Sequence, residues 1–141
     1  MTYDSDSVGQ TEAIAAELAR SLAAGVCVAL RGELGAGKTQ FVRGLVGGLG
    51  GPARAVSSPT FVLLNVYPGG RLTVYHLDAY RATGPGDFEA IGFPELLEQG
   101  GIVVVEWPER VAELIPADHV SVRIEVIDER SRRITIERVT G

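Results

Sequence analysis

The stretch Gly32-Glu33-Leu34-Gly35-Ala36-Gly37-Lys38-Thr39 decides the fold of this chain. It has Gly, four residues, Gly, Lys and then Thr, a pattern typical of a loop that binds phosphate. Glycines let such a backbone turn its N–H groups toward an anion, and the following helix adds its own unpaired N–H groups and the positive end of its dipole. Lys38 would reach the outer phosphates, and the Thr39 hydroxyl would reach a magnesium ion. The expected phosphate-binding residues are Gly35, Ala36, Gly37, Lys38, Thr39 and Gln40.

The sequence on either side places this loop between a strand and a helix. Residues Val26 to Leu30 are a continuous apolar run between glycines, which predicts a strand buried on both faces. The residues after Lys38 predict a helix whose apolar face consists of Phe41, Val42, Leu45 and Val46. The glycines expected to end it are Gly47, Gly48, Gly50 and Gly51. A glycine-rich turn that matches the pattern by chance is the alternative, but strand, turn and helix are the context that the motif requires.

The remaining elements follow from periodicity and turn residues. Ser7 and Gln10 have the spacing of a capping box before a helix over residues 8–23, with Ile14, Leu18 and Leu22 on one face. The other expected elements are a hairpin of residues 60–67 and 71–77, a loop over 84–101 with a short helix at 95–98, a strand over 102–105, a helix over 108–114, and a C-terminal antiparallel pair at a sheet edge, turning at 128–130. Residues 1–6 are expected to be flexible. Together these elements predict an α/β fold with helices packed on a mixed sheet.

Composition bounds the class of protein. The chain has 141 residues and a formal net charge of -5, so a single domain over residues 1–141 is expected. The acidic balance argues against a protein that binds nucleic acid by charge alone. The single cysteine, Cys27, and the lack of a secretory signal or an apolar spanning segment point to the cytoplasm. Lys38 is the only lysine among 13 basic residues.

Two carboxylates are candidates to complete a magnesium site. Glu106 ends the apolar strand 102–105, which delivers it to the carboxyl end of the sheet, and Asp78 leaves another strand in the same way. A solvated Glu and an ordinary turn Asp are the alternatives. Thr39 and Glu106 are the metal candidates, and the ion would be magnesium rather than zinc. His76 and His119 lack the partners of a metal site.

Three further features have both a functional and a structural interpretation. Thr60, in Ser57-Ser58-Pro59-Thr60, falls where a loop that senses the γ-phosphate would lie, but any surface loop can carry such residues. Trp107 is a core residue or, if exposed, a contact surface for a partner. The cluster of Arg130, Arg132 and Arg133 is a solvated turn or a cover for a flat ring. The only asparagine is Asn65, so the Asn-Lys-x-Asp element of Ras-type GTPases is absent.

Four blocks in order resemble one family. They are the loop at 32–39, Ser-Pro-Thr-Phe at 58–61, His-Leu-Asp-Ala-Tyr-Arg at 76–81 and Val-Glu-Trp-Pro-Glu at 105–109. Together they resemble the TsaE family, also called YjeE, over about residues 7 to 136. These are small bacterial ATPases needed to make threonylcarbamoyladenosine (t6A) in tRNA. The resemblance implies a three-layer α/β fold of the P-loop NTPase type and an ATPase that works on the complex of TsaD and TsaB.

The resemblance also implies roles for individual residues. Lys38 and the loop amides would hold the phosphates of ATP, Thr39 and Glu106 would bind Mg²⁺, and Asp78 would be the acidic residue needed for hydrolysis. Thr60 would lie in the switch-like loop, and Trp107 would follow the metal-binding Glu. The expected adenine pocket uses Val8, Thr11 and Arg132. Glu33 stands where the family more often has Asp, and Gln40 replaces a frequent second Thr.

Three functions remain open from the sequence. The first is an ATPase whose turnover depends on partner proteins and is slow alone, because no arginine finger or activating Gln is evident. The second is a module in which ATP binding alone gates assembly with a partner. The third is a small-molecule kinase in which the arginine cluster near residue 130 clamps a second substrate.

Overall fold

A seven-stranded mixed sheet forms the centre of the described residues, which are 1–57, 64–80, 82 and 85–141 of this computed structural model. The strand order is β1-β7-β6-β2-β5-β4-β3. Strands β6, β2, β5 and β4 run parallel, whereas β1, β7 and β3 each pair antiparallel with a neighbour. The strands are β1 (Thr2–Ser5), β2 (Cys27–Gly32), β3 (Leu64–Tyr67), β4 (Val74–Asp78), β5 (Ile102–Glu106), β6 (His119–Val126) and β7 (Arg132–Val139). The predicted mixed, partly antiparallel sheet is confirmed.

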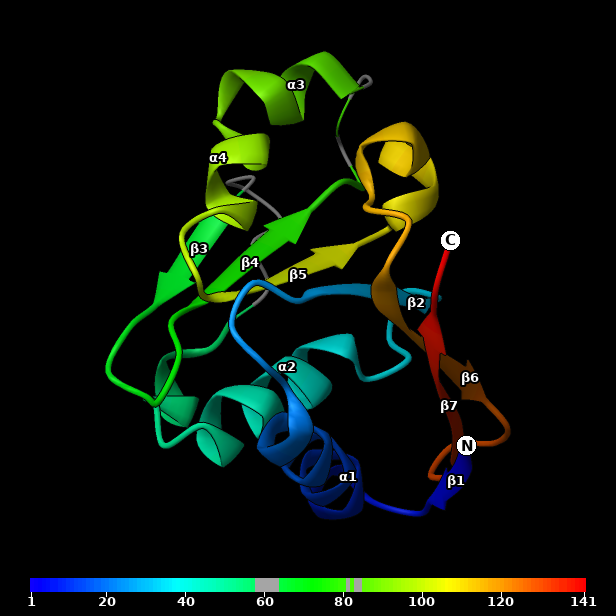
Figure 1. Ribbon diagram of the computed structural model, residues 1–141. Helices are drawn as coiled ribbons and strands as arrows, with labels where there is room; N and C mark the ends of the chain where they lie inside the picture. Colours follow the sequence, from blue (N-terminus) through cyan, green and yellow to red (C-terminus); the bar gives the residue numbers. More distant parts are fainter. Residues whose placement is uncertain (58–63, 81, 83–84) are drawn as a thin grey trace.

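Helices cover the sheet on both sides, which makes three layers (Figure 1). On one side lie α1 (Val8–Ser21) and α2 (Lys38–Gly48), followed by the short 3₁₀ helix η1 (Ala53–Ala55). On the other side lie α3 (Pro85–Ala90), α4 (Phe93–Leu97) and the 3₁₀ helix η2 (Pro108–Leu114). The three-layer α/β architecture expected from the resemblance is therefore the observed one.

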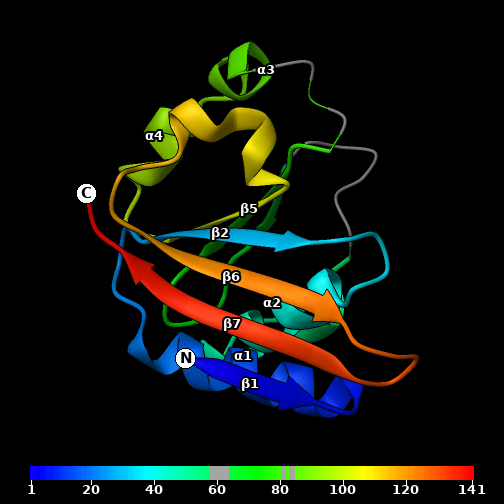
Figure 2. The same ribbon diagram turned by 90° about the vertical axis from the view of Figure 1, so that its right-hand side faces the viewer.

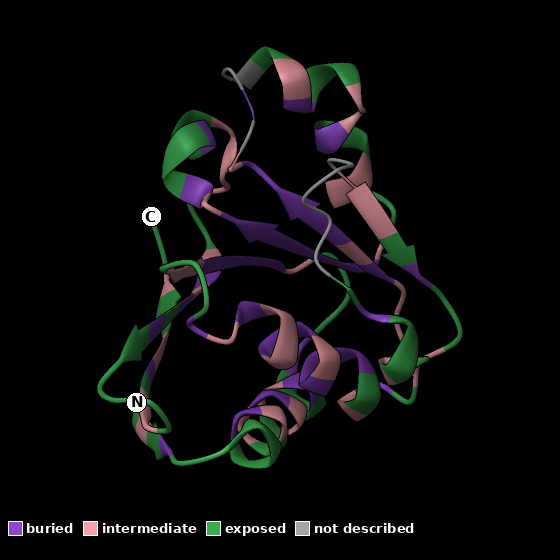
Figure 3. Cartoon of the chain, turned by 180° about the vertical axis from the view of Figure 1, so that it is seen from behind, coloured by how far each residue is buried: buried purple, intermediate pink, exposed green. Residues whose placement is uncertain are grey.

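The central strands are buried on both faces, as their continuous apolar runs predict. In β2, Val28 and Leu30 contribute to the core beneath α1 and α2, and Cys27 contributes to the core on the opposite face. In β5, successive residues alternate between the same two cores. Figure 3 shows these strands as the most continuously buried part of the fold. Burial raises the pKa of the Cys27 thiol to about 12, so this cysteine is a packing residue.

Helices α1 and α2 approach each other unusually closely. A Cβ atom at Gly44 would lie 2.3 Å from the carbonyl oxygen of Glu12, and one at Gly48 would lie 2.7 Å from Cα of Ala16. The buried residues of α1 are accordingly small: Thr11, Ala15 and Ala19. Ile14 and Leu18, expected to form the apolar face, are only partly buried at the edge of this contact. The close approach selects small side chains for the contact, while Leu22, the third residue of the predicted apolar face, is buried in the core.

Residues 1–6 differ from the expectation of a flexible segment. Thr2–Ser5 form β1, which pairs antiparallel with β7, as Figure 2 shows at the edge of the sheet. Ser5 is fully buried, and its hydroxyl forms a 2.8 Å hydrogen bond with the Thr11 hydroxyl. The C-terminal antiparallel pair is confirmed, but β7 is not an edge strand because β1 pairs with its outer edge.

Two other boundaries differ from the predictions. Most of residues 84–101 was expected to be loop, but α3 and α4 occupy much of it, and Phe88 and Phe93 anchor them in the core. Helix α2 continues through Gly47 and Gly48, and the chain turns at Gly50, which has a φ of 83°. The predicted hairpin of β3 and β4 is confirmed over the described residues. Among those residues, no helix combines the length and the apolar character needed to cross a bilayer.

Candidate functional site

The predicted phosphate loop connects β2 to α2 at the carboxyl end of the parallel strands. Gly35 and Gly37 have φ values of 81° and 107°, in the left-handed region where a side chain would strain the backbone. Gly37 is also the N-cap residue of α2. Because glycine has no side chain, the start of this helix has no side-chain cap in the described structure. Its first N–H groups and the positive end of its dipole therefore face the loop. This is the local geometry that binds an anion.

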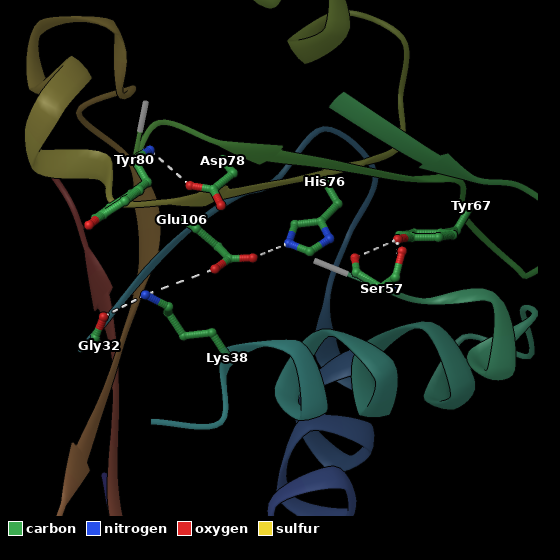
Figure 4. Close-up of polar contacts among 8 residues, drawn as sticks. All are labelled: Gly32, Lys38, Ser57, Tyr67, His76, Asp78, Tyr80 and Glu106. Carbon is green, nitrogen blue, oxygen red and sulfur yellow. Dashed lines mark hydrogen bonds and ion pairs between the residues drawn. The ribbon is translucent and has the colours of Figure 1, made fainter. Parts of the chain in front are cut away.

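Lys38 points from the start of α2 into a group of polar residues (Figure 4). Its Nζ donates a hydrogen bond to the Gly32 carbonyl at 2.6 Å, and it lies 3.9 Å from Oε1 of Glu106. The side chain is 6% exposed. Burial lowers the pKa of Lys38, and the negative charges of Glu106 and Asp78 oppose that shift. The ammonium group is therefore held away from bulk water. In this buried position its attraction for an anion is screened less than it would be at the surface.

The two predicted carboxylates lie side by side at the ends of adjacent parallel strands. Asp78 of β4 is opposite Glu106 of β5 in the sheet register, and both side chains are buried. The backbone N–H of Tyr80 donates to Oδ1 of Asp78 at 2.8 Å. Burial nevertheless raises the pKa of Asp78, because removal from water disfavours the charged carboxylate. The interpretation of Glu106 as a solvated residue is wrong, whereas Asp78 does accept the hydrogen bond of a turn aspartate but is buried at the site.

His76 is a site residue that sequence reasoning missed. Its side chain is fully buried in β4, and its Nε2 lies 2.5 Å from Oε2 of Glu106. Nδ1 has no hydrogen-bond partner among the described residues. A proton on Nε2 would donate to Oε2 of Glu106, which leaves Oε1 on the side of Lys38. The signal in the sequence was His76 itself, a polar residue two positions before Asp78 in an apolar strand.

Trp107 follows Glu106 in a conformation that is rare for its residue type. Its φ is 55°, and it is the one non-glycine residue with a positive φ in the part of the chain that the structure describes. The half-buried ring lies 4.1 Å from the Lys38 ammonium, measured to the ring centroid, and 5.1 Å from the Tyr80 ring centroid. A strained backbone held by its surroundings is often found at functional sites. Trp107 is therefore neither a pure core residue nor a fully exposed contact surface.

Two adjoining cavities open around the loop. The first, of about 340 Å³, is lined by Leu34, Gly35, Gly37, Lys38, Thr39, Gln40, Asp78, Tyr80, Glu106 and Trp107. The second, of about 460 Å³, is lined by Asp6, Ser7, Val8, Thr11, Gly35, Ala36, Gly37, Gln40, Glu129, Arg130 and Arg132. Gly35, Gly37 and Gln40 border both cavities. The loop thus separates a charged cavity from a larger one beside the start of α1.

The structure brings together nearly all of the predicted site residues. Val8, Thr11 and Arg132, expected around a base, line the larger cavity, and Thr39, Asp78 and Glu106 line the charged one. Thr60 lies outside the described residues. The arginine cluster does not form one clamp, because Arg132 bonds to the loop carbonyl of Ala36 while Arg133 lies 3.4 Å from Asp4. Adjacent residues of a strand point to opposite faces, which separates these two arginines.

The donor set of the charged cavity suits a hydrated magnesium ion that also binds phosphate. The Thr39 hydroxyl and the Glu106 carboxylate, which both line this cavity, are hard oxygen donors. Among the described residues, no group of three or more His, Cys, Asp or Glu could hold a metal without other ligands. Mg²⁺ fits such a site, because it usually takes one or two protein ligands and completes its shell with water and phosphate oxygens.

Comparison with known proteins agrees with the geometry. The family model described as threonylcarbamoyl adenosine biosynthesis protein TsaE matches residues 5–134. A TsaE from Treponema pallidum is 46% identical over 83% of this chain and 85% of its own length. A TsaE from Bacillus subtilis is 36% identical over 92% of this chain and 80% of its own length.

A solved structure gives the same result for the fold. The crystal structure of Bacillus subtilis YdiB superposes with a TM-score of 0.81 at 29% sequence identity, over all of this chain and 86% of that one. The fold is that of a P-loop NTPase. With a phosphate loop, two strand-end carboxylates and a family match over most of its length, the chain belongs to the TsaE family of threonylcarbamoyl adenosine biosynthesis proteins.

Proposed function

We propose that this protein binds Mg-ATP across the two cavities and hydrolyses it in the cytoplasm, in support of t6A synthesis on tRNA by the TsaD–TsaB complex. One observation supports the proposal most directly. Lys38, Asp78 and Glu106 converge in one cavity beside the uncapped start of α2. The t6A pathway is the one named for the relatives, and TsaD and TsaB are the partners that the family resemblance implies.

The charged cavity would hold the phosphates and the metal. Lys38 would exchange its bond to the Gly32 carbonyl for the outer phosphate oxygens, and the first N–H groups of α2 would bind the remaining charge. Thr39 and Glu106 would be ligands of Mg²⁺, with His76 fixing the Glu106 carboxylate. When bound, the ion supplies positive charge that neutralises the transferred phosphoryl group.

Asp78 is suited to handle the attacking water. Its carboxylate lies in the same cavity as Lys38, and its second oxygen is left for a further contact once Oδ1 has accepted the Tyr80 N–H. Its raised pKa makes it a better proton acceptor than an ordinary aspartate. Asp78 would orient the water and accept its proton, while Lys38 stabilises the negative charge of the phosphates.

The larger cavity would hold the nucleoside. Its lining includes the exposed apolar side chain of Val8, which can pack on a flat base, and polar groups from the start of α1 and the β6–β7 turn. The shared border at Gly35, Gly37 and Gln40 allows one ligand to extend from one cavity into the other. A nucleoside triphosphate has this elongated shape, with an apolar end and an anionic end.

Release of inorganic phosphate from ATP, measured with and without purified TsaD and TsaB, tests the proposal. We expect slow release by the protein alone and a large increase with both partners, because charged groups supplied by a partner accelerate phosphate-loop enzymes strongly. Lys38→Ala is the control: it should remove most ATP binding in calorimetry and leave the circular dichroism spectrum unchanged. ATP binding with no phosphate release under either condition would contradict the proposed hydrolysis. Transfer of phosphate to a metabolite would indicate a kinase instead.

A further inference from the structure

Arg132, at the start of β7, connects two segments that are far apart in the sequence. Its Nε donates to the carbonyl oxygen of Ala36 in the phosphate loop at 3.0 Å. Its Nη1 donates to the carbonyl oxygens of Asp128 and Ser131 in the β6–β7 turn at 2.8 and 3.0 Å. We propose that Arg132 is a positioning residue that holds the phosphate loop in its anion-binding shape, rather than a residue that binds the base. This inference rests on the proposed binding of ATP.

The bond to Ala36 fixes a peptide group that would otherwise rotate easily. The carbonyl of Ala36 and the N–H of Gly37 belong to one planar peptide, so they point in opposite directions. Gly35 and Gly37 both have positive φ values, and glycine allows the peptides around it many orientations. With the Ala36 carbonyl held toward Arg132, the Gly37 N–H is directed to the opposite side of the loop. The preceding amide is fixed as well, because the Ala36 N–H donates to the Glu33 carbonyl at 3.0 Å.

Hydrogen bonds within the β6–β7 turn and to its carbonyls orient the Arg132 side chain. Oδ1 of Asp128 accepts hydrogen bonds from the backbone N–H groups of Arg130 and Ser131, at 2.9 and 2.8 Å. These bonds lower the pKa of Asp128 and fix the turn whose carbonyls hold Arg132. A guanidinium carries five N–H donors in a rigid plane, so it can bond to the turn and the loop together. A lysine at this position would keep the charge but not this planar set of N–H donors.

Arg133 provides a matched control for the charge. It is the next residue of β7, it is half exposed, and its Nε lies 3.4 Å from Oδ1 of Asp4 at the surface. Arg133→Gln therefore removes one positive charge from the neighbouring position of β7 without removing a bond to the loop. Arg132→Lys keeps the positive charge but removes the guanidinium group that bonds to both the loop and the turn. The two variants separate the geometric role from a purely electrostatic one.

The experiment measures dissociation constants for ATP and for inorganic tripolyphosphate, both with Mg²⁺. Four proteins are compared by competition against a fluorescent ATP analogue: the wild type, Arg132→Lys, Arg132→Gln and Arg133→Gln. Tripolyphosphate has the phosphates but no base, so it reports on the loop alone. We expect both Arg132 variants to weaken both ligands by about tenfold, the loss typical of one hydrogen bond to a charged group. Arg133→Gln should change either affinity by less than about threefold.

Three outcomes would overturn the inference while ATP binding by the wild type still stands. They are full affinity in Arg132→Lys, a loss confined to ATP, and a wild type that binds ATP but no tripolyphosphate. The first outcome would show that only the charge of Arg132 matters, and the second would show that Arg132 contacts the base. The third would show that the loop binds no phosphate by itself. Thermal melts without ligand check that each variant is folded. Failure of the wild type to bind ATP would instead refute the proposed function, and the inference with it.

Discussion

At the scale of single residues, the site depends on contacts between positions that are far apart in the chain. Glu106 and Asp78 could be predicted as site residues because each ends an apolar strand, and the carboxyl ends of neighbouring parallel strands meet. The partner of His76 could not be predicted, because its contact with Glu106 requires the register between β4 and β5. Arg132 lines the same cavity as Val8 and Thr11, with which the family resemblance groups it, but its bond to the Ala36 carbonyl depends on the shape of the β6–β7 turn.

Replacement of His76 tests its contact with Glu106. His76→Leu leaves a buried carboxylate without its hydrogen-bond donor, so we expect the free energy of unfolding to fall by about 2 kcal/mol. The Mg²⁺ concentration needed for half-maximal phosphate release should rise at least about tenfold, as when other partners of metal ligands are removed. His76→Gln, which keeps a donor, should restore much of the Mg²⁺ response. Urea titration and phosphate release measure the two effects. An unchanged Mg²⁺ response in the leucine variant would refute the positioning role.

The raised pKa of Asp78 predicts a pH-dependent gain in stability when its charge is removed. Because the folded-state pKa lies above the unfolded one, the folded protein binds the proton more tightly, and stability is lost as pH rises through the folded pKa. Asp78→Asn should therefore raise the melting temperature of the ligand-free protein near neutral pH. The gain should disappear below the ordinary aspartate pKa, where both states are protonated. Melting curves across this pH range measure it, and a gain that persists in acid would contradict the explanation.

At the scale of elements, the sequence predicts the helices and strands whose patterns lie within a few contiguous residues. The strand, loop and helix from β2 to α2 carry their pattern in contiguous residues, and so does the β6–β7 pair. The short strand β1 has a largely polar sequence, and its partner β7 lies at the other end of the chain. Helices α3 and α4 are each anchored by a phenylalanine in a core that only the folded sheet provides. Tertiary contacts, rather than local propensity, decide these elements.

The close contact of α1 and α2 predicts opposite effects for two glycines of the same helix. Gly44→Ala would place Cβ against the backbone of Glu12, so we expect it to reduce the free energy of unfolding by about 2–3 kcal/mol. In Gly47→Ala the nearest atom is the Ala53 Cβ at 3.4 Å, an ordinary contact. This control should be neutral or stabilising by up to about 1 kcal/mol, since alanine favours helix. Chemical denaturation distinguishes them, and equal effects would contradict the close approach.

At the scale of the whole molecule, the candidate site is built from segments that are far apart in the sequence. Each of the two cavities is lined by several of these segments. The larger one is lined by the start of α1, the phosphate loop and the β6–β7 turn, and the charged one by the phosphate loop and the ends of β4 and β5. These segments span the sequence from Asp6 to Arg132, so a ligand in both cavities would contact most layers of the fold. Binding should therefore be coupled to global stability.

This coupling can be measured with a non-hydrolysable ATP analogue and Mg²⁺. At a ligand concentration of 100 times the dissociation constant, the gain in stability is about 2.7 kcal/mol, or a rise of about 8 °C in melting temperature for a chain of this size. Lys38→Ala should show little of this rise at the same concentration. Differential scanning calorimetry measures both proteins. An equal rise in the two would place the analogue at a different site.

The burial of the single lysine has a practical chemical consequence. Lys38 is the single lysine of the chain, its side chain is 6% exposed, and its nitrogen is bonded to the Gly32 carbonyl. Mild acylation with an activated ester should consequently leave Lys38 unmodified. An adduct on Lys38 would report directly that the nucleotide site had opened.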